Sequence, residues 1–147
     1  MANVDPFALA RFVAAQEPVY VQALAELRRG RKTSHWMWFV FPQIHGLGRS
    51  AMSREYAIRS LAEARAYLDH RVLGPRLREC VDAVLALEGQ SAEAIFGDVD
   101  AAKFRSSLTL FEAAAHEPAL FARALDAYFG GTRDAETLRL LGVSPAL

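Results

Sequence analysis

Cysteine is almost missing from this chain of 147 residues, which contains Cys80 alone. An internal disulfide is therefore impossible, and a metal site built from cysteines is excluded. Cys80 has apolar neighbours in a predicted helix, so we interpret it as a small core residue. The four histidines include no pair with the i, i+4 spacing and the nearby carboxylate of a helical zinc site. We expect no metal and no other cofactor.

An excess of charge is also missing, as is any long hydrophobic run. Lys plus Arg and Asp plus Glu both number 17, so the formal net charge is zero. Nucleic acid is therefore an unlikely partner, and a short basic run at residues 28–32 is typical of a helix C-terminus. No apolar segment reaches the length of a membrane span, and the first residues lack a signal-peptide pattern. A cytoplasmic protein that does not bind membranes is the expectation.

The hydrophobic content and the helix signals of the sequence predict one compact, all-α (or nearly all-α) domain over residues 1–147. The hydrophobic fraction is 52%, and the chain is long enough to bury its own core. Asp5 and Pro6 open a first helix, and Ser53 is predicted to cap a short one carrying residues 56–58. We expect about seven or eight short helices around a central aromatic segment. Further helices are predicted at 19–28, 61–68, 75–87, 92–96, 101–115, 118–129 and 134–141.

The central segment, residues 31–50, has the sequence RKTSHWMWFVFPQIHGLGRS. Residues 36–41 form an unbroken apolar block, and Pro42 prevents a regular helix or a central strand from running through it. We predict a buried segment that is extended or irregularly helical. The block is either the centre of the core or the wall of a pocket with polar groups at its rim, and we interpret it as both.

Three residues at the start of the block have two interpretations each. His35 is either a general base or a hydrogen-bond donor to a ligand, or it is a partly buried histidine whose ring N–H donates to a backbone carbonyl. Trp36 and Trp38 would share one face in an extended backbone and could hold a flat ring between them, whereas in a helix they would diverge. As core residues the two tryptophans need no ligand to explain them.

The turn after the block supplies further candidates. Gly46 and Gly48 let the backbone approach a ligand and could present N–H groups to an anion, although turns use glycine for backbone reasons alone. Gln43, Ser50 and Tyr56 flank the turn and could contact a phosphate or a ribose.

A polar patch is predicted on the helix at 101–115. Its core stripe is apolar, while Lys103 and Ser107 share another face with Ser106 beside them. Two adjacent serines are unfavourable inside a helix, so a role beyond helix formation is one interpretation. A plain solvent-facing surface is the other.

The pattern K-x-x-HWMWFVFPQ-x-x-GLG-x-S, from Lys32 to Ser50, is followed by Tyr-Ala-Ile at 56–58 and by D-x-x-K-x-x-SS-x-TLF from Asp100 to Phe111. Together these motifs resemble the DUF1810 family over residues 11–142. The motifs are specific and cover nearly the whole chain. The resemblance implies a mainly helical fold and assigns no activity.

A second resemblance concerns an aromatic residue and proline, a glycine turn, and then Ser53, Glu55 and Tyr56 entering a helix. This order is similar to the NADAR family, also called YbiA-like, which is linked to hydrolysis of N-glycosidic bonds in ADP-ribose or riboflavin-intermediate chemistry. The chain departs from that family because Arg54 follows Ser53 directly and because a closing acidic-Trp-Gly segment is missing. These departures leave open whether the activity is shared.

Two functions from different classes follow. The first is binding, and possible hydrolysis, of a nucleotide-like or ADP-ribose-like small molecule, with Glu55 and His35 as catalytic candidates because glycosidic hydrolysis normally needs a carboxylate. The alternative is a non-enzymatic protein-interaction module with no small-molecule site. The predicted ligand-binding residues are Lys32, Trp36, Trp38, Gln43, Gly46, Gly48, Ser50, Tyr56, Lys103, Ser106 and Ser107.

Overall fold

The computed structural model describes residues 5–143, and over that range the chain is all-α. Extended pairing within these residues is limited to one parallel bridge between Ile44 and Ile58. The described residues form ten helices: α1 (Ala10–Gln16), α2 (Tyr20–Arg28), α3 (Met37–Val40), α4 (Ala51–Glu55), α5 (Leu61–Asp69), α6 (Leu73–Leu85), α7 (Ala92–Phe96), α8 (Asp98–Ala114), α9 (Ala119–Phe129) and α10 (Ala135–Leu141). The predicted fold class is confirmed. The count exceeds the expected seven or eight, in part because the aromatic block forms a helical turn of its own.

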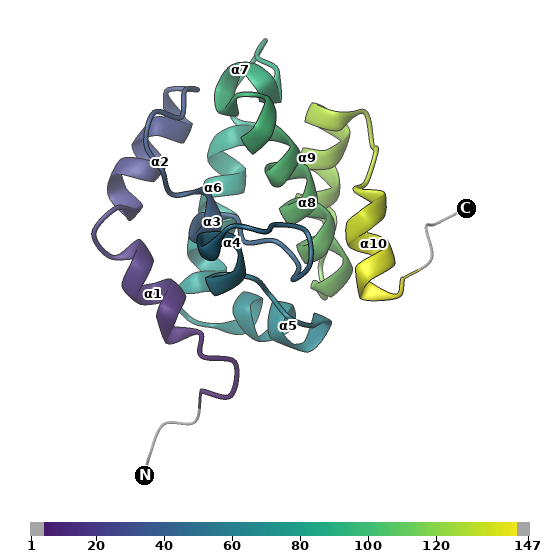
Figure 1. The fold of residues 1–147 in the computed structure, drawn as a ribbon. Coiled ribbons are helices and arrows are strands. Elements are labelled where there is room, and N and C mark those ends of the chain that lie inside the picture. Colours follow the sequence, from purple (N-terminus) through teal and green to yellow (C-terminus); the bar gives the residue numbers. More distant parts are fainter. Residues whose placement is uncertain (1–4, 144–147) are drawn as a thin grey trace.

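Two long helices organise the packing. Helix α8 packs against α5, α7, α9 and α10, while α6 packs against α2, α5 and α9. Figure 1 shows α1 and α2 along one side of the molecule and α9 and α10 along the other, with the short α3 and α4 in front. Helix α3 also packs against α1, so the central segment joins the N-terminal pair to the rest of the molecule.

The aromatic block lies mostly in the core. Trp36 is 1% exposed, and Met37, Phe39, Val40 and Phe41 are buried with it. The centroid of the Phe41 ring lies 4.9 Å from that of Phe104 on α8, in the edge-to-face arrangement that aromatic pairs prefer. Because residues 37–40 form a helical turn, the two tryptophans diverge, and Trp38 alone stays half-buried.

Several predicted helix starts are confirmed by their caps. The side chains of Ser60, Ser91 and Asp134 each accept the backbone N–H three residues further on, which satisfies a donor that has no partner within the helix. Helix α7 has the predicted bounds, and α8 buries its predicted stripe, which includes Phe104 and Phe111.

Three local predictions are wrong. Asp5 and Pro6 do not open the first helix, because α1 begins at Ala10, and the Asp5 carboxylate instead accepts the backbone N–H groups of Leu9 and Ala10. Ser50, and not Ser53, caps α4, and residues 56–58 follow this helix instead of forming it. Ile58 is extended there because its N–H donates to the Gln43 carbonyl at 2.9 Å. Gly74 and the following proline do not separate two helices but lie in the first turn of α6, where proline is tolerated.

Candidate functional site

A buried carboxylate holds the loop that precedes the aromatic block. Glu26 on α2 is fully buried and accepts the backbone N–H groups of Thr33 at 2.7 Å and Ser34 at 2.9 Å. The same carboxylate accepts the Ser34 hydroxyl at 2.5 Å and the Trp36 indole N–H at 3.0 Å. The sequence analysis missed this residue, because a glutamate on a helix gives no local signal of a partner elsewhere in the fold. Glu26 thereby fixes the position of residues 32–36.

The charge of Glu26 is stabilised by these bonds. Burial raises the pKa of the carboxyl. The hydrogen bonds from the Ser34 hydroxyl, from the backbone of Thr33 and Ser34 and from the Trp36 indole together lower the pKa by more than burial raises it. The net result is a pKa of about 2, so Glu26 is ionised at neutral pH.

Lys32 is fixed beside this loop. Its side chain is 7% exposed, and Nζ lies 2.8 Å from Oδ2 of Asp100 at the start of α8. The same Nζ donates to the Ser34 carbonyl at 2.6 Å and lies 5.1 Å from the centroid of the Trp36 ring. Since an ammonium has three donors, these partners nearly saturate it. We interpret Lys32 as a structural link between the loop and α8.

Lys103 lies on the same side of α8 and is less constrained. Its Nζ is 3.7 Å from Oδ1 of Asp100 and 5.5 Å from the centroid of the Trp38 ring. The Lys103 side chain is 25% exposed. Four predicted site residues therefore come together around Asp100, which is marked in the sequence only as the first residue of the second family motif. We call Lys32, Trp36, Trp38, Asp100 and Lys103 the lysine–tryptophan cluster.

The two serines of α8 have different environments. The Ser106 hydroxyl lies 3.1 Å from both the Ala102 carbonyl and Oδ2 of Asp134, so its one proton is shared between them and helps to attach the start of α10. Ser107 lies one turn beyond Lys103 and is 1% exposed. Its hydroxyl has no hydrogen-bond partner among the described residues, which is unusual for a buried polar atom.

The residues around the glycine turn contribute to packing. A Cβ on Gly46 would lie 3.4 Å from two methyl carbons of Leu140 on α10, and one on Gly48 would lie 2.4 Å from Cβ of Ser53. Gly48 thus permits a close approach to α4. Ser50 is exposed and caps α4, and the side chain of Gln43 is half-buried.

His35 and Tyr56 differ in exposure. His35 is exposed, so it is not the partly buried histidine that was one of its two interpretations. Tyr56 is half-buried, and its ring packs 5.8 Å from that of Phe12 and 5.3 Å from that of Phe39. Burial, together with the nearby Glu55 carboxylate, raises the pKa of the Tyr56 phenol.

Glu55, the predicted catalytic carboxylate, lines a different hollow between the start of α1, the end of α4 and the start of α5. Arg11, Arg59 and Glu63 line the same hollow. Arg11 is committed to the fold there, because it donates to the Glu55 and Ala57 carbonyls at 2.9 Å and pairs with Glu63 at 3.0 Å. The structure therefore places Glu55 with Arg11 and not within the lysine–tryptophan cluster.

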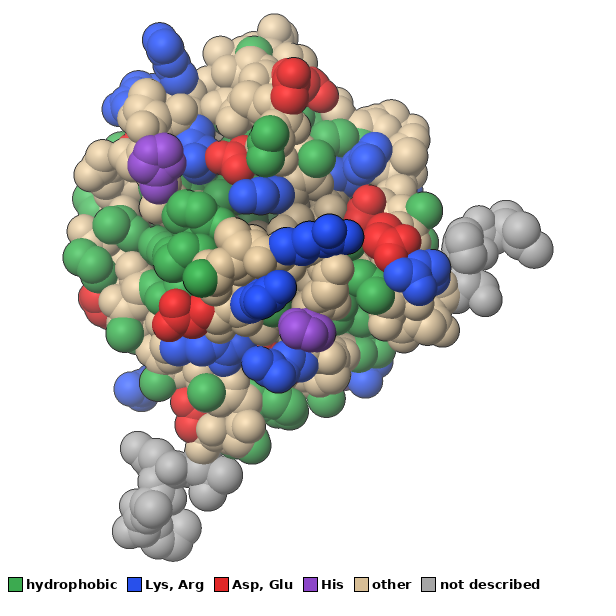
Figure 2. Space-filling model, viewed as in Figure 1, with side chains coloured by type: hydrophobic (Ala, Val, Ile, Leu, Met, Phe, Trp, Pro, Cys, Tyr) green, Lys and Arg blue, Asp and Glu red, His purple; other side chains and the backbone are tan. Residues whose placement is uncertain are grey.

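One face of the molecule combines apolar and basic side chains. Figure 2 shows hydrophobic side chains left of centre and Lys and Arg side chains across the middle of the face, with histidine and acidic side chains among and around them. The large hydrophobic residues that are exposed within residues 5–143 are Val21, Val99 and Val143, which belong to three different segments.

Comparisons with known proteins agree with the helical architecture. The sequence model of a family described as "Protein of unknown function (DUF1810)" matches residues 6–141. The crystal structure of the conserved hypothetical protein Rv1873 from Mycobacterium tuberculosis is 52% identical, with a TM-score of 0.93 over 95% of this chain and 100% of that one. No curated protein matches the chain. The likeness to the NADAR family receives no support from these comparisons. Within residues 5–143, no helix is long and apolar enough to cross a bilayer.

Proposed function

The chain belongs to the DUF1810 family, and from its own geometry we propose that the lysine–tryptophan cluster binds a small anionic ligand with a flat ring, such as a nucleotide or ADP-ribose. The observation that carries the proposal is the position of Lys103 over the half-buried ring of Trp38. The proposal concerns binding. It does not extend to hydrolysis, because Glu55 lies beside Arg11 and apart from the cluster.

Lys103 is the cation available to such a ligand. Its 3.7 Å contact with Asp100 is longer than a hydrogen bond, so the three donors of the ammonium remain open to a stronger partner. Two lysines against one aspartate leave the cluster with one net positive charge. Lys32 pairs at 2.8 Å with Oδ2 of Asp100, the oxygen that does not face Lys103.

Trp38 offers the apolar half of the site. Its ring lies beside Lys103 at the surface, whereas Trp36 is buried and bonded to Glu26. An aromatic ring beside a cation suits a ligand that carries a flat base next to a phosphate, since stacking on one aromatic side chain contributes about 1–3 kcal/mol per base.

The test is a calorimetric titration of ADP-ribose, AMP and NAD into the protein, with tryptophan fluorescence followed in parallel. We expect Lys103→Gln and Trp38→Leu each to weaken binding at least about tenfold, and added salt to weaken it in the wild type. Arg123→Gln, at an exposed position of α9, is the matched control and should bind as the wild type does. Absence of binding at millimolar ligand, or equal affinity of Lys103→Gln and the wild type, would overturn the proposal.

A further inference from the structure

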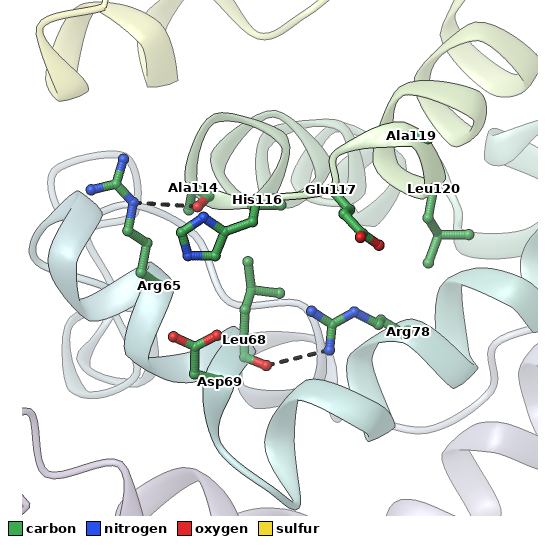
Figure 3. A pocket seen from close by; sticks show the side chains of 10 residues that line it. Arg65, Leu68, Asp69, Arg78, Ala114, His116, Glu117, Ala119 and Leu120 are labelled. Carbon is green, nitrogen blue, oxygen red and sulfur yellow. Dashed lines mark hydrogen bonds between the residues drawn. The ribbon is translucent and has the colours of Figure 1, made fainter.

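A second hollow of about 380 Å³ lies away from the lysine–tryptophan cluster, between α5, the start of α6 and the link from α8 to α9. Figure 3 shows its charged side chains around an apolar centre. Asp69 and Arg78 lie on either side of Leu68, and the link supplies His116 and Glu117 opposite them. Charges of both signs therefore face a common space.

Arg78 is held in place without being neutralised. Its Nη1 donates to the Leu68 carbonyl at 3.3 Å, which leaves most of its five N–H donors free. Gly74 makes this arrangement possible, because a Cβ there would lie 2.0 Å from the Leu68 oxygen and 3.0 Å from Nη1 of Arg78. Arg65, on the other side, bonds the Ala114 carbonyl through Nε at 3.4 Å and points its outer nitrogens away from the hollow. Arg78 is thus the guanidinium that a ligand in the hollow would meet.

The acidic groups of the hollow are unpaired. Neither Asp69 nor Glu117 takes part in an ion pair among residues 5–143, although Arg78 borders the same space. Asp69 and Arg78 therefore face one hollow without neutralising each other. A molecule that carries an ammonium and a carboxylate would give each of them a partner of opposite charge, whereas a ligand of single charge would leave one of them uncompensated.

The apolar lining of the hollow suits a ligand whose uncharged part is also apolar. Leu68 lies between Asp69 and Arg78 in Figure 3, and Leu120 borders the hollow from α9. We propose that this hollow binds a small zwitterion with an apolar side chain, which in chemical class is an aliphatic α-amino acid. Its carboxylate meets Arg78, its ammonium meets Asp69, and its side chain packs on the two leucines. The site is independent of the nucleotide-like ligand proposed above.

The experiment compares L-leucine with two analogues that each lack one charge, by calorimetry on the full chain. Isocaproate keeps the carboxylate and isopentylamine keeps the ammonium. For the wild type we expect saturable leucine binding, and binding of both analogues weaker by at least about tenfold, the usual cost of one lost charged hydrogen bond.

Two variants assign the charges. In Arg78→Gln, leucine should lose its advantage over isopentylamine, and in Asp69→Asn it should lose its advantage over isocaproate. Arg78→Lys restores the charge and should recover part of the preference for a carboxylate. Arg123→Gln, outside the hollow, should leave the whole pattern unchanged, and circular dichroism checks that each variant folds. The proposal is overturned by no leucine binding up to about 10 mM, by equal wild-type affinity for leucine and either analogue, or by tighter binding of inorganic phosphate than of leucine.

Discussion

Glu26 shows how one side chain can set the position of a whole loop. Its two oxygens accept from Thr33, Ser34, Trp36 and Gln22, so five donors converge on one buried carboxylate. Lys32 belongs to the loop that this carboxylate holds, and its own bond to Asp100 depends on the position of that loop. The charge on Glu26 therefore matters to the lysine–tryptophan cluster without being part of it.

Acid should weaken the fold through this residue. The folded-state pKa of Glu26 is about 2, below the ordinary 4.5, so its contribution of about 3 kcal/mol is present above pH 4.5 and is lost as the pH falls toward 2. We expect Glu26→Gln to lower the free energy of unfolding by about 2–4 kcal/mol at pH 7. At pH 3 its deficit relative to the wild type should shrink by about 2 kcal/mol. Urea titrations at both pH values measure this.

The control for this prediction is Glu88→Gln, at an exposed position, which should change stability by less than about 0.5 kcal/mol. A deficit of Glu26→Gln that is as large at pH 3 as at pH 7 would show that the charge is not the source of the stability.

Individual residues of the site were predictable where a local pattern marked them. Lys103 and Ser107 share a helix face by their spacing, and Trp36 and Trp38 stand out by composition. Glu26 and Asp100 were missed as partners, because both act on groups distant in the sequence, and a sequence without a fold does not pair them. The separate location of Glu55 also depends on how α1, α4 and α5 meet.

At the scale of elements, the attachment of α10 to α8 depends on Ser106, the first serine of the Ser-Ser pair, and not on Ser107. Asp134 caps α10 by accepting the Thr137 N–H at 3.1 Å, and the same oxygen accepts the Ser106 hydroxyl at 3.1 Å. The backbone N–H of Asp134 donates in turn to the Thr109 hydroxyl at 3.0 Å. Asp134 therefore both caps α10 and contacts α8, so the first turn of α10 is attached to α8.

Loss of this group should therefore cost more than an ordinary helix cap. Asp134→Ala removes the cap, leaves the Thr137 hydroxyl without its acceptor and removes the bond from Ser106 to α10, although Ser106 keeps the Ala102 carbonyl. We expect a loss of about 2–3 kcal/mol in the free energy of unfolding. Hydrogen exchange should increase first in α10. Glu136→Ala, an exposed position on the same helix, should change stability by less than about 0.5 kcal/mol. Equal effects of the two substitutions would contradict this account.

Helices were predictable from the sequence where a cap and an apolar stripe coincide, as for α5, α7 and α10. The short turns were not, because α3 and α4 depend on neighbours: α3 packs on α1, and α4 ends where Ile58 pairs with Ile44. Gly74 and Pro75 illustrate the same limit. They look like a break, but glycine is needed there for the close approach to the Leu68 carbonyl, and the helix continues through it.

At the scale of the whole molecule, one buried cluster connects elements from both ends of the chain. It includes Phe12 from α1, Trp36 and Phe41 from the central segment, Phe104 from α8 and Phe121 from α9. Phe104 lies within 4.9 Å of the Phe41 ring and 4.7 Å of the Phe96 ring, measured between centroids. Because the cluster is shared, no group of helices has a core of its own to retain when the others unfold.

Unfolding should therefore be a single cooperative transition. In urea, the fluorescence of the buried Trp36, observed alone in Trp38→Phe, should change at the same midpoint as the helical signal in circular dichroism. Phe104→Leu should shift both curves together, by about 1–2 kcal/mol, since it removes packing that joins the central segment to α7 and α8. Val99→Ala, on the exposed side of α8, should move neither curve by more than about 0.5 kcal/mol. Separate midpoints for the two signals would mean that part of the chain keeps its structure without the aromatic block, and the central segment would then not be what holds the helices together.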